Sequence, residues 1–502
     1  MSRCAFGVLL VCAFLGLATA KKAEALNFYV DGTCSTAGNG TADQCASGAG
    51  SAGAFRDPQS CFSAVGAGDT CYIKNGTYVS SNHGRDPNED GGFHVDASGT
   101  SSAPITIRNY PGHSPLLANC PLSQTTFCDH PTITAYAKSY IVFDGLRVAG
   151  TYSLFGVPGT GAHGIVIRNS EVTVGWEEYA GGNWAGIRLE DQNGALVQYN
   201  NIHDIYVTTN GGAQSSGSCV KLYQNTDTIV EYNRCRDVPI PESQAGGIDD
   251  KAQAVRNIHR YNLIERVNSC VRINNQLNST GVQIYGNVCV GTPGTERPGV
   301  RLIVNVNGID IHNNTFYGFA QGLQIMNEGG VVSGVRWYNN IVAGATVLHN
   351  IEAYQTSLVV SNYNSWRSGA RYMYGGLSVA SLGSFLTSGF DAQSSETDCQ
   401  FVSAGSDFRL ASSSSCRNAG RVSGVSSGAA VDRGAYGVTS CVGNTCAGGG
   451  QQPPTSRAPA SPQNLRIFSS ELRDLLLHDF AAPALDKRRA QLRDLLHQAI
   501  AG

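Results

Sequence analysis

A short phrase recurs along the middle of the chain, with small variations: an aromatic residue or histidine, then asparagine, then an apolar residue. Its asparagines follow one another at steps of 33, 29, 25, 27, 26 and 24 residues: Asn200, Asn233, Asn262, Asn287, Asn314, Asn340 and Asn364. A unit of this length cannot bury its own apolar face, but a stack of such units can. The repeat therefore predicts a solenoid, in which the asparagines stack into a hydrogen-bonded ladder.

Each unit also carries short segments in which apolar and polar residues alternate, as in a half-buried strand. One segment leads into the asparagine phrase, and another precedes it at residues 186–189, 219–222, 247–249, 270–273, 299–302 and 322–325. The L-x-x-L-x-L pattern of leucine-rich repeats is missing, and a propeller blade needs four strands in ~40 residues. The pattern thus predicts an all-β chain that folds as a right-handed parallel β-helix.

The two ends of the chain differ from this repeat. Arg3, an apolar run at 6–17 and an Ala-Thr-Ala motif at 18–20 predict a signal peptide at 1–20. A membrane anchor is the alternative, but the run is shorter than the ~20 residues that span a bilayer. We expect the β-helix with its N-terminal cap at 21–446, a Gly/Pro-rich linker at 447–469 and an amphipathic helical tail at 470–502. The protein is thus expected to be secreted, with no membrane partner after signal cleavage.

The cysteine content agrees with secretion. Of the 16 cysteines, Cys4 and Cys12 lie in the predicted signal peptide, and the even number of 14 that remain is typical of an oxidising compartment. Four close pairs indicate local disulfides: Cys34/Cys45, Cys61/Cys71, Cys120/Cys128 and Cys441/Cys446. Four other cysteines, by the alternative interpretation, are small buried residues stacked within the repeat: Cys219, Cys235, Cys270 and Cys289.

Superposing the first strands of successive units predicts one continuous outward face, because neighbouring strands lie ~4.8 Å apart. Its first row is Arg188, Lys221, Asp249, Arg272, Arg301 and Gln324, and its second row is Glu190, Tyr223, Lys251, Asn274, Ile303 and Met326. Only 15% of the chain is charged, so this concentration of cations predicts a groove that binds a polyanion. A solvated sheet face whose charges prevent aggregation is the alternative. The formal net charge of −3 argues against a nucleic-acid partner.

The segments at 28–32, 68–73 and 104–108, and the closing segments at 407–410 and 431–436, resemble those of pectate-lyase-like β-helix proteins. This resemblance covers roughly residues 27 to 440 and implies fold more than chemistry. Around Lys251, the chain is similar to the chondroitinase B and alginate lyase family, with Arg272 one coil later and Arg260-Tyr261-Asn262 between them. The resemblance implies that Lys251 is the Brønsted base and that Arg272 is the second catalytic residue.

That family also holds a calcium ion through acidic residues a few positions before its lysine. Here those positions are 244–247 and carry no acid, so Asp249, Asp250 and Glu190 are the candidate ligands for calcium (Ca2+). A free lysine has a pKa of ~10.4, and neighbouring cations such as Arg272 lower it toward the range of a base. The alternative for Lys251 is a surface ion pair with aspartate, worth ~0–1 kcal/mol.

The sequence therefore predicts a secreted lyase for an acidic polysaccharide such as alginate, pectate or a glycosaminoglycan. Lys251 removes the proton at C5, Tyr223 is a candidate donor to the leaving oxygen, and four residues bind substrate: Arg188, Lys221, Arg301 and Asn274. A polygalacturonase-like hydrolase that uses Asp249 and Asp250 is one alternative. A non-catalytic carbohydrate-binding or adhesin β-helix is another. The sequence makes no prediction of oligomeric state.

Overall fold

The computed structural model describes residues 24–446 apart from short gaps: 81–91, 120–129, 152–154, 158–160, 178–184, 208–216, 239–245, 275–276, 293–296, 327–329, 345–346, 352–358, 370, 375–376, 380–390 and 444. The predicted signal peptide, linker and C-terminal helical tail lie outside these residues, as does the pair Cys120/Cys128. Among the described residues, no helix is both long enough and apolar enough to cross a bilayer.

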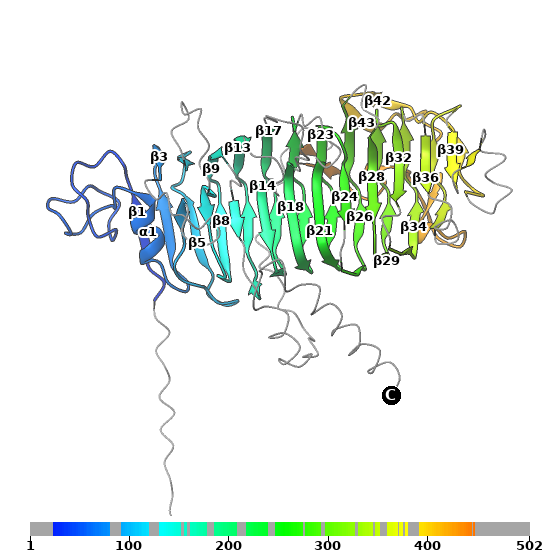
Figure 1. The fold of residues 1–502 in the computed structure, drawn as a ribbon. Helices are drawn as coiled ribbons and strands as arrows, with labels where there is room; N and C mark the ends of the chain where they lie inside the picture. The colour runs from blue at the N-terminus through cyan, green and yellow to red at the C-terminus, as the bar shows by residue number, and fades with distance from the viewer. Residues whose placement is uncertain are drawn as a thin grey trace, which may run out of the picture. The chain divides into compact units, whose positions relative to one another are not determined.

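The described chain winds through three parallel sheets, and strands that follow one another in space belong to successive coils (Figure 1). Sheet 1 runs from β4 (Phe93–His94) through β14 (Ala185–Glu190), β18 (Ser218–Thr226), β21 (Gly246–Val255), β24 (Val271–Asn274) and β28 (Pro298–Ile303) to β32 (Gln321–Met326) and beyond. Sheet 2 has twelve strands from β1 (Asn27–Val30) to β37 (Val359–Asn362), and sheet 3 has twelve from β3 (Thr77–Val79) to β41 (Ser395–Glu396). This is the predicted right-handed parallel β-helix.

One coil shows how the sequence makes this path. The chain runs along β21 in sheet 1, β22 (Ile258–Arg260) in sheet 2 and β23 (Leu263–Val267) in sheet 3, and then enters β24 of the next coil. Alternate residues point inward, so Ile248 and Ile273 stack with their equivalents in a core that is continuous along the solenoid. A parallel pair of strands needs such a long connection, and here the other two sheets of the coil provide it.

The predicted asparagine ladder is present at the turn between sheets 2 and 3. From Asn233 onward, each side-chain Oδ1 accepts the backbone N–H of the asparagine one coil earlier. Examples are Asn233 N to Asn262 Oδ1 at 3.0 Å and Asn262 N to Asn287 Oδ1 at 3.0 Å. The residue before each ladder asparagine has a positive φ, which lets the chain turn within two residues; Tyr232 (54°) and Gly286 (66°) are examples. The ladder fixes the register of successive coils.

The corner between sheets 3 and 1 is tight, and the sequence fills it in two ways. Disulfides Cys219–Cys235 and Cys270–Cys289 each cross the inside of one coil. In the coil between them the same inward position is Gly247, where a Cβ atom would lie 2.5 Å from Ile264 Cγ2. The interpretation of these four cysteines as merely stacked is therefore wrong, because a cysteine on each side of this corner brings two sulfurs into bonding distance.

The other disulfides lie near the ends of the solenoid. The predicted pairs Cys34–Cys45 and Cys61–Cys71 are confirmed, and Cys399–Cys416 is an additional one. Cys441 is disulfide-bonded as well and lies opposite Cys446 in an antiparallel strand pair. Disulfides of this number are typical of an oxidising, extracellular compartment.

Both ends of the described chain cover part of the solenoid. At the N-terminal end lies helix α1 (Pro58–Ala64) (Figure 1). Its N-cap is Asp57, whose carboxylate accepts the Ser60 N–H at 2.8 Å, and Phe62 packs on Phe93. At the other end, residues 401–442 fold back over sheet 3. Their apolar side chains form a second small core with Val288 and its neighbours. The outward face of sheet 1 is not part of this second core.

Candidate functional site

The two rows predicted along sheet 1 are aligned in the predicted register. In sheet 1 the pairing of β14, β18, β21, β24, β28 and β32 aligns Arg188, Lys221, Asp249, Arg272, Arg301 and Gln324. Two residues further along the same strands, the pairing aligns Tyr223, Lys251, Asn274, Ile303 and Met326, with Glu190 beside Tyr223. These residues therefore lie on the same side of sheet 1, with Lys251 near the middle of the second row.

Asp249 binds the cations on both sides of it in the first row. Its Oδ2 lies 3.4 Å from Lys221 Nζ on β18, and its Oδ1 accepts a hydrogen bond of 2.9 Å from Arg272 Nε on β24. All three side chains are buried, with 0% of Lys221, 0% of Asp249 and 2% of Arg272 exposed. Burial alone would raise the pKa of Asp249, but the charges of Arg272 and Lys221 outweigh it and hold that pKa below its ordinary value.

Asp250 lies on the opposite face of the same strand. It pairs with inward residues of the neighbouring coils, and its Oδ2 accepts hydrogen bonds from His259 Nε2 at 3.0 Å and from Asn257 Nδ2 at 2.9 Å. Both Asp250 and His259 are fully buried inside the solenoid. Burial raises the pKa of Asp250, and the hydrogen bonds from His259 and Asn257 offset part of that rise. Asp250 therefore does not face a substrate.

This geometry does not bring the three expected calcium ligands together. Asp249 faces outward and is neutralised by two cations, Asp250 faces the interior, and Glu190 forms an ion pair with Arg188. A calcium ion takes six to eight oxygen ligands that converge on one point, and residues on opposite faces of a strand cannot do this. Within the described residues, the predicted donor set does not fit calcium, and no step of the chemistry is assigned to it.

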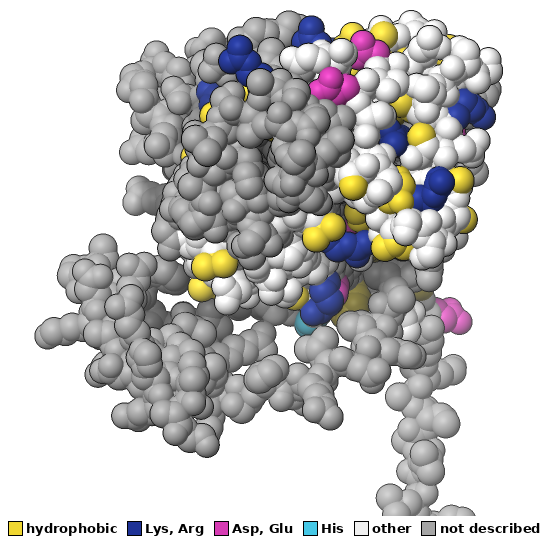
Figure 2. All heavy atoms as spheres, turned by 90° about the vertical axis from the view of Figure 1, so that its right-hand side faces the viewer, with side chains coloured by type: hydrophobic (Ala, Val, Ile, Leu, Met, Phe, Trp, Pro, Cys, Tyr) yellow, Lys and Arg dark blue, Asp and Glu magenta, His cyan; other side chains and the backbone are white. Residues whose placement is uncertain are grey.

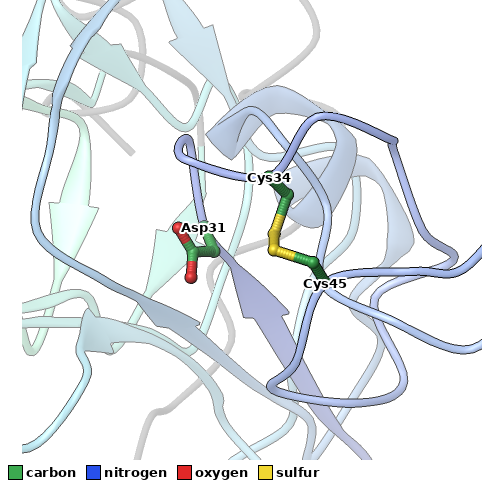
Figure 3. Close-up of side chains that lie close together, drawn as sticks. All are labelled: Asp31, Cys34 and Cys45. Carbon is green, nitrogen blue, oxygen red and sulfur yellow. A yellow bond between two sulfur atoms is a disulfide. The ribbon is translucent and has the colours of Figure 1, made fainter.

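The described residues hold one other group of metal-binding type, at the N-terminal end. Asp31 lies close to Cys34 and Cys45, but the two sulfurs are bonded to each other (Figure 3). The Asp31 carboxylate pairs with Lys74 Nζ at 3.3 Å. Neither cysteine is available as a thiolate ligand. This cluster is therefore a structural element of the first coils.

Lys251, the expected base, lies near the middle of the second row. Lys251 is only partly buried, on the same face of sheet 1 as Tyr223 and Asn274 of the adjacent coils. Burial lowers its pKa; the Asp249 carboxylate opposes this, while the charges of Arg272 and Arg188 act in the same direction as burial, so that the net shift is downward. A surface ion pair with aspartate would instead raise the pKa of a lysine.

Two residues expected to contact substrate are covered. Burial lowers the pKa of Lys221 to about 7, against the opposing charge of Asp249, but its side chain is inaccessible to solvent in this structure. Arg272 is almost as deeply buried. We expected the first row to face solvent. The structure differs because Lys221 and Arg272 both pair with Asp249 in one buried ion cluster.

The other expected residues remain at the surface. Tyr223 is half-buried, and burial together with the charge of Glu190 raises the pKa of its hydroxyl, so the group is protonated at neutral pH. Arg188, Asn274 and Arg301 are each partly exposed, and Arg301 Nε lies 3.0 Å from Met326 Sδ. These residues flank Lys251 on both sides along the solenoid.

At the end face of the solenoid on the right of Figure 1, the described residues show no comparable concentration of charge. Among the described residues drawn there, Lys and Arg side chains (dark blue) are scattered, and hydrophobic side chains (yellow) are dispersed among polar surface (Figure 2). Scattered exposed side chains of either kind are ordinary on a protein surface. The described residues drawn in this view therefore form no second candidate site.

The His259–Asp250 pair was not predicted from the sequence. The two residues lie on different sheets, and their contact exists only once the coil closes. Strict alternation along β21 does place Asp250 inward, between the outward Asp249 and Lys251. An inward carboxylate needs a buried partner, so a histidine at an inward position of the next strand was the signal available.

No family model matches the chain, and no curated protein matches it. Among solved structures, pectate lyase Pel9A is similar with a TM-score of 0.53 and 18% identity, over 82% of this chain and 95% of that one. A rhamnogalacturonan lyase has a TM-score of 0.46 and 15% identity over 68% and 87% of the two chains. A PL6 family polysaccharide lyase from Pseudopedobacter saltans has 0.38 and 13% over 65% and 86%. The coil geometry and the first of these likenesses together show that the described chain has the pectate-lyase-like right-handed parallel β-helix fold.

Proposed function

We propose that this protein is a secreted polysaccharide lyase that cleaves a uronic-acid-containing polysaccharide by β-elimination, with Lys251 as the base. One observation carries the proposal: Lys251 is a partly exposed lysine of lowered pKa, at the middle of a row that Tyr223 and Asn274 continue on either side. A structural neighbour that is a pectate lyase supports this class of reaction. The disulfides support secretion.

The reaction needs three things from the protein. The substrate carboxylate has to be neutralised, because only then is the C5 proton acidic enough to remove. Lys251 Nζ takes that proton, the electron pair forms the C4–C5 double bond, and the C4–O bond breaks. The leaving oxygen receives a proton from Tyr223. The products are a new reducing end and an unsaturated uronate, and no water is consumed.

We assign different roles to the cations around Lys251. Arg188 and Arg301 are partly exposed, each two coils from Lys251, which is ~10 Å along the solenoid at ~4.8 Å per coil. We assign to them, with Asn274, the contacts to substrate. Arg272 is buried and acts on Lys251 through its positive charge, which helps to keep the lysine neutral.

A hydrolase that uses Asp249 and Asp250 is less well supported. Inverting hydrolysis needs an acid and a base on either side of one bond, with their carboxyl groups ~6.5–9.5 Å apart in a shared cleft. These two carboxylates lie on opposite faces of β21, and Asp250 is inside the solenoid. A non-catalytic binding protein would present the same basic rows without turnover.

One experiment separates the three functions. The purified protein is offered alginate, pectate and glycosaminoglycans, and both ultraviolet absorbance of the unsaturated product and new reducing ends are followed. The lyase predicts that both signals rise together on at least one uronan. Reducing ends without absorbance would indicate hydrolysis. Binding without either signal would indicate a carbohydrate-binding protein.

A further inference from the structure

Asp249 forms ion pairs with two cations of the first row. One carboxylate oxygen lies 3.4 Å from Lys221 Nζ on the preceding coil, and the other accepts a hydrogen bond of 2.9 Å from Arg272 Nε on the following coil. A single side chain thus joins three successive strands of sheet 1. Its exposed fraction is 0%, so it contacts these cations and not solvent.

This ion triad lies directly beside the proposed base. Asp249 and Lys251 are two residues apart on β21 and face the same side, while Lys221 and Arg272 lie on the strands that carry the second-row neighbours of Lys251. The side chains of Lys221 and Arg272 are therefore held in the row next to Lys251, on the two strands that pair with its own. Without the Asp249 carboxylate, the buried cations Lys221 and Arg272 would lie next to Lys251 with no anion of the first row between them.

We propose that Asp249 is a positioning residue, and not a metal ligand: its carboxylate gathers Lys221 and Arg272 into a buried triad that holds Lys251 in line with the substrate. This inference rests on the proposed function of the site. The charges of Asp249 on its own strand, Arg272 on the next coil and Arg188 two coils before all affect the pKa of Lys251. Tyr223 and Asn274 are its register neighbours on the adjacent strands.

The chain offers a matched control for this proposal. Asp227 also pairs with an arginine of the following coil, accepting hydrogen bonds of 2.7 and 2.6 Å from Arg256, but both side chains are exposed, at 36% and 55%. Asp249→Asn and Asp227→Asn thus make the same chemical change in a buried and in an exposed Asp–Arg pair. Only the first is expected to affect the reaction.

The test compares steady-state kinetics of the two variants on the uronan that the wild-type protein cleaves. Asp249→Asn is expected to lower kcat about 100-fold with little change in KM, as a small misplacement of a reacting group does. It should also move the acid limb of the pH–rate profile to lower pH, because the Asp249 carboxylate stabilises protonated Lys251. Loss of structure alone would lower the active fraction without moving this limb. Asp227→Asn should match wild type in both respects.

Two further variants keep the proposal testable if Asp249→Asn does not fold. Asp249→Asn combined with Lys221→Met removes one charge of each sign, and Asp249→Glu keeps the carboxylate but shifts it by one methylene. Both are expected to fold, as judged by circular dichroism, and to have a lowered kcat. A kcat within a few-fold of wild type in either folded variant would overturn the proposal.

A calcium dependence would overturn it as well. If Asp249 were a metal ligand, added calcium chloride would restore part of the activity of Asp249→Asn, and a chelator would abolish that of wild type. The failure of this inference is distinguishable from that of the proposed function. Wild-type protein inactive on every uronan contradicts the function, whereas active wild type with a normal Asp249→Asn contradicts only the positioning role.

Discussion

Removing one rung of the asparagine ladder should cost a large part of the stability of the solenoid. Asn262 lies in the middle of the ladder and is 1% exposed. Its Oδ1 accepts the Asn233 N–H at 3.0 Å, and its Nδ2 donates to the Val230 carbonyl at 2.9 Å and to Asn287 Oδ1 at 3.0 Å. Asn262→Ala leaves the Asn233 N–H and the Val230 carbonyl without the partner that this side chain supplies.

A buried backbone group that loses its partner costs about 1–3 kcal/mol, so two such groups predict a loss of about 2–6 kcal/mol. That is a substantial part of the 5–15 kcal/mol typical of a folded domain. Denaturant unfolding with linear extrapolation measures the change in the free energy of unfolding. Asn278→Ala is the matched control, because Asn278 is exposed and its side chain makes no hydrogen bond to the described residues. Equal stabilities of the two variants would refute the reasoning about the ladder.

Three further predictions follow from the structure. Burial lowers the pKa of His312, stacked between Tyr285 and Tyr338, so stability should fall as the pH drops below the unfolded value of about 6.5, and His312→Tyr should remove this slope in pH-dependent unfolding curves. Replacing Cys219 and Cys235 together by alanine should cost about 2–5 kcal/mol in the same assay, and an unchanged stability would contradict a bridging role for them. A chelator should leave the activity on uronans unchanged, because the expected calcium ligands do not converge; loss of activity that calcium restores would contradict this.

The register of the solenoid could be predicted because its cause is local and repeated. Each coil carries the same asparagine before the same strand, so aligning Asn233 with Asn262 also aligns the strands that precede them. Alternation then settles which residues face outward, and the row through Lys251 follows. In a solenoid, repeats that are neighbours in the sequence are also neighbours in space.

The contacts within the site could not be predicted in the same way. Alternation places Asp249 outward, but whether its carboxylate meets solvent, a metal or two cations depends on the side-chain conformations of three separate coils. Asp250 and His259 meet across the interior, between two sheets whose distance the sequence does not state. The disulfides at the corner between sheets 3 and 1 could not be predicted for the same reason. Their cysteines are 16 and 19 residues apart and come together only when a coil closes.

The role of Lys251 as the base is the central claim, and one measurement tests it most directly. Lys251→Ala is compared with wild type for the rise in ultraviolet absorbance on the uronan that wild type cleaves, with the circular dichroism spectrum as the control for folding. General-base catalysis is worth about 10²–10⁴-fold, so a loss of rate in that range is expected in a folded variant. Retention of most of the lyase activity by Lys251→Ala would contradict the account.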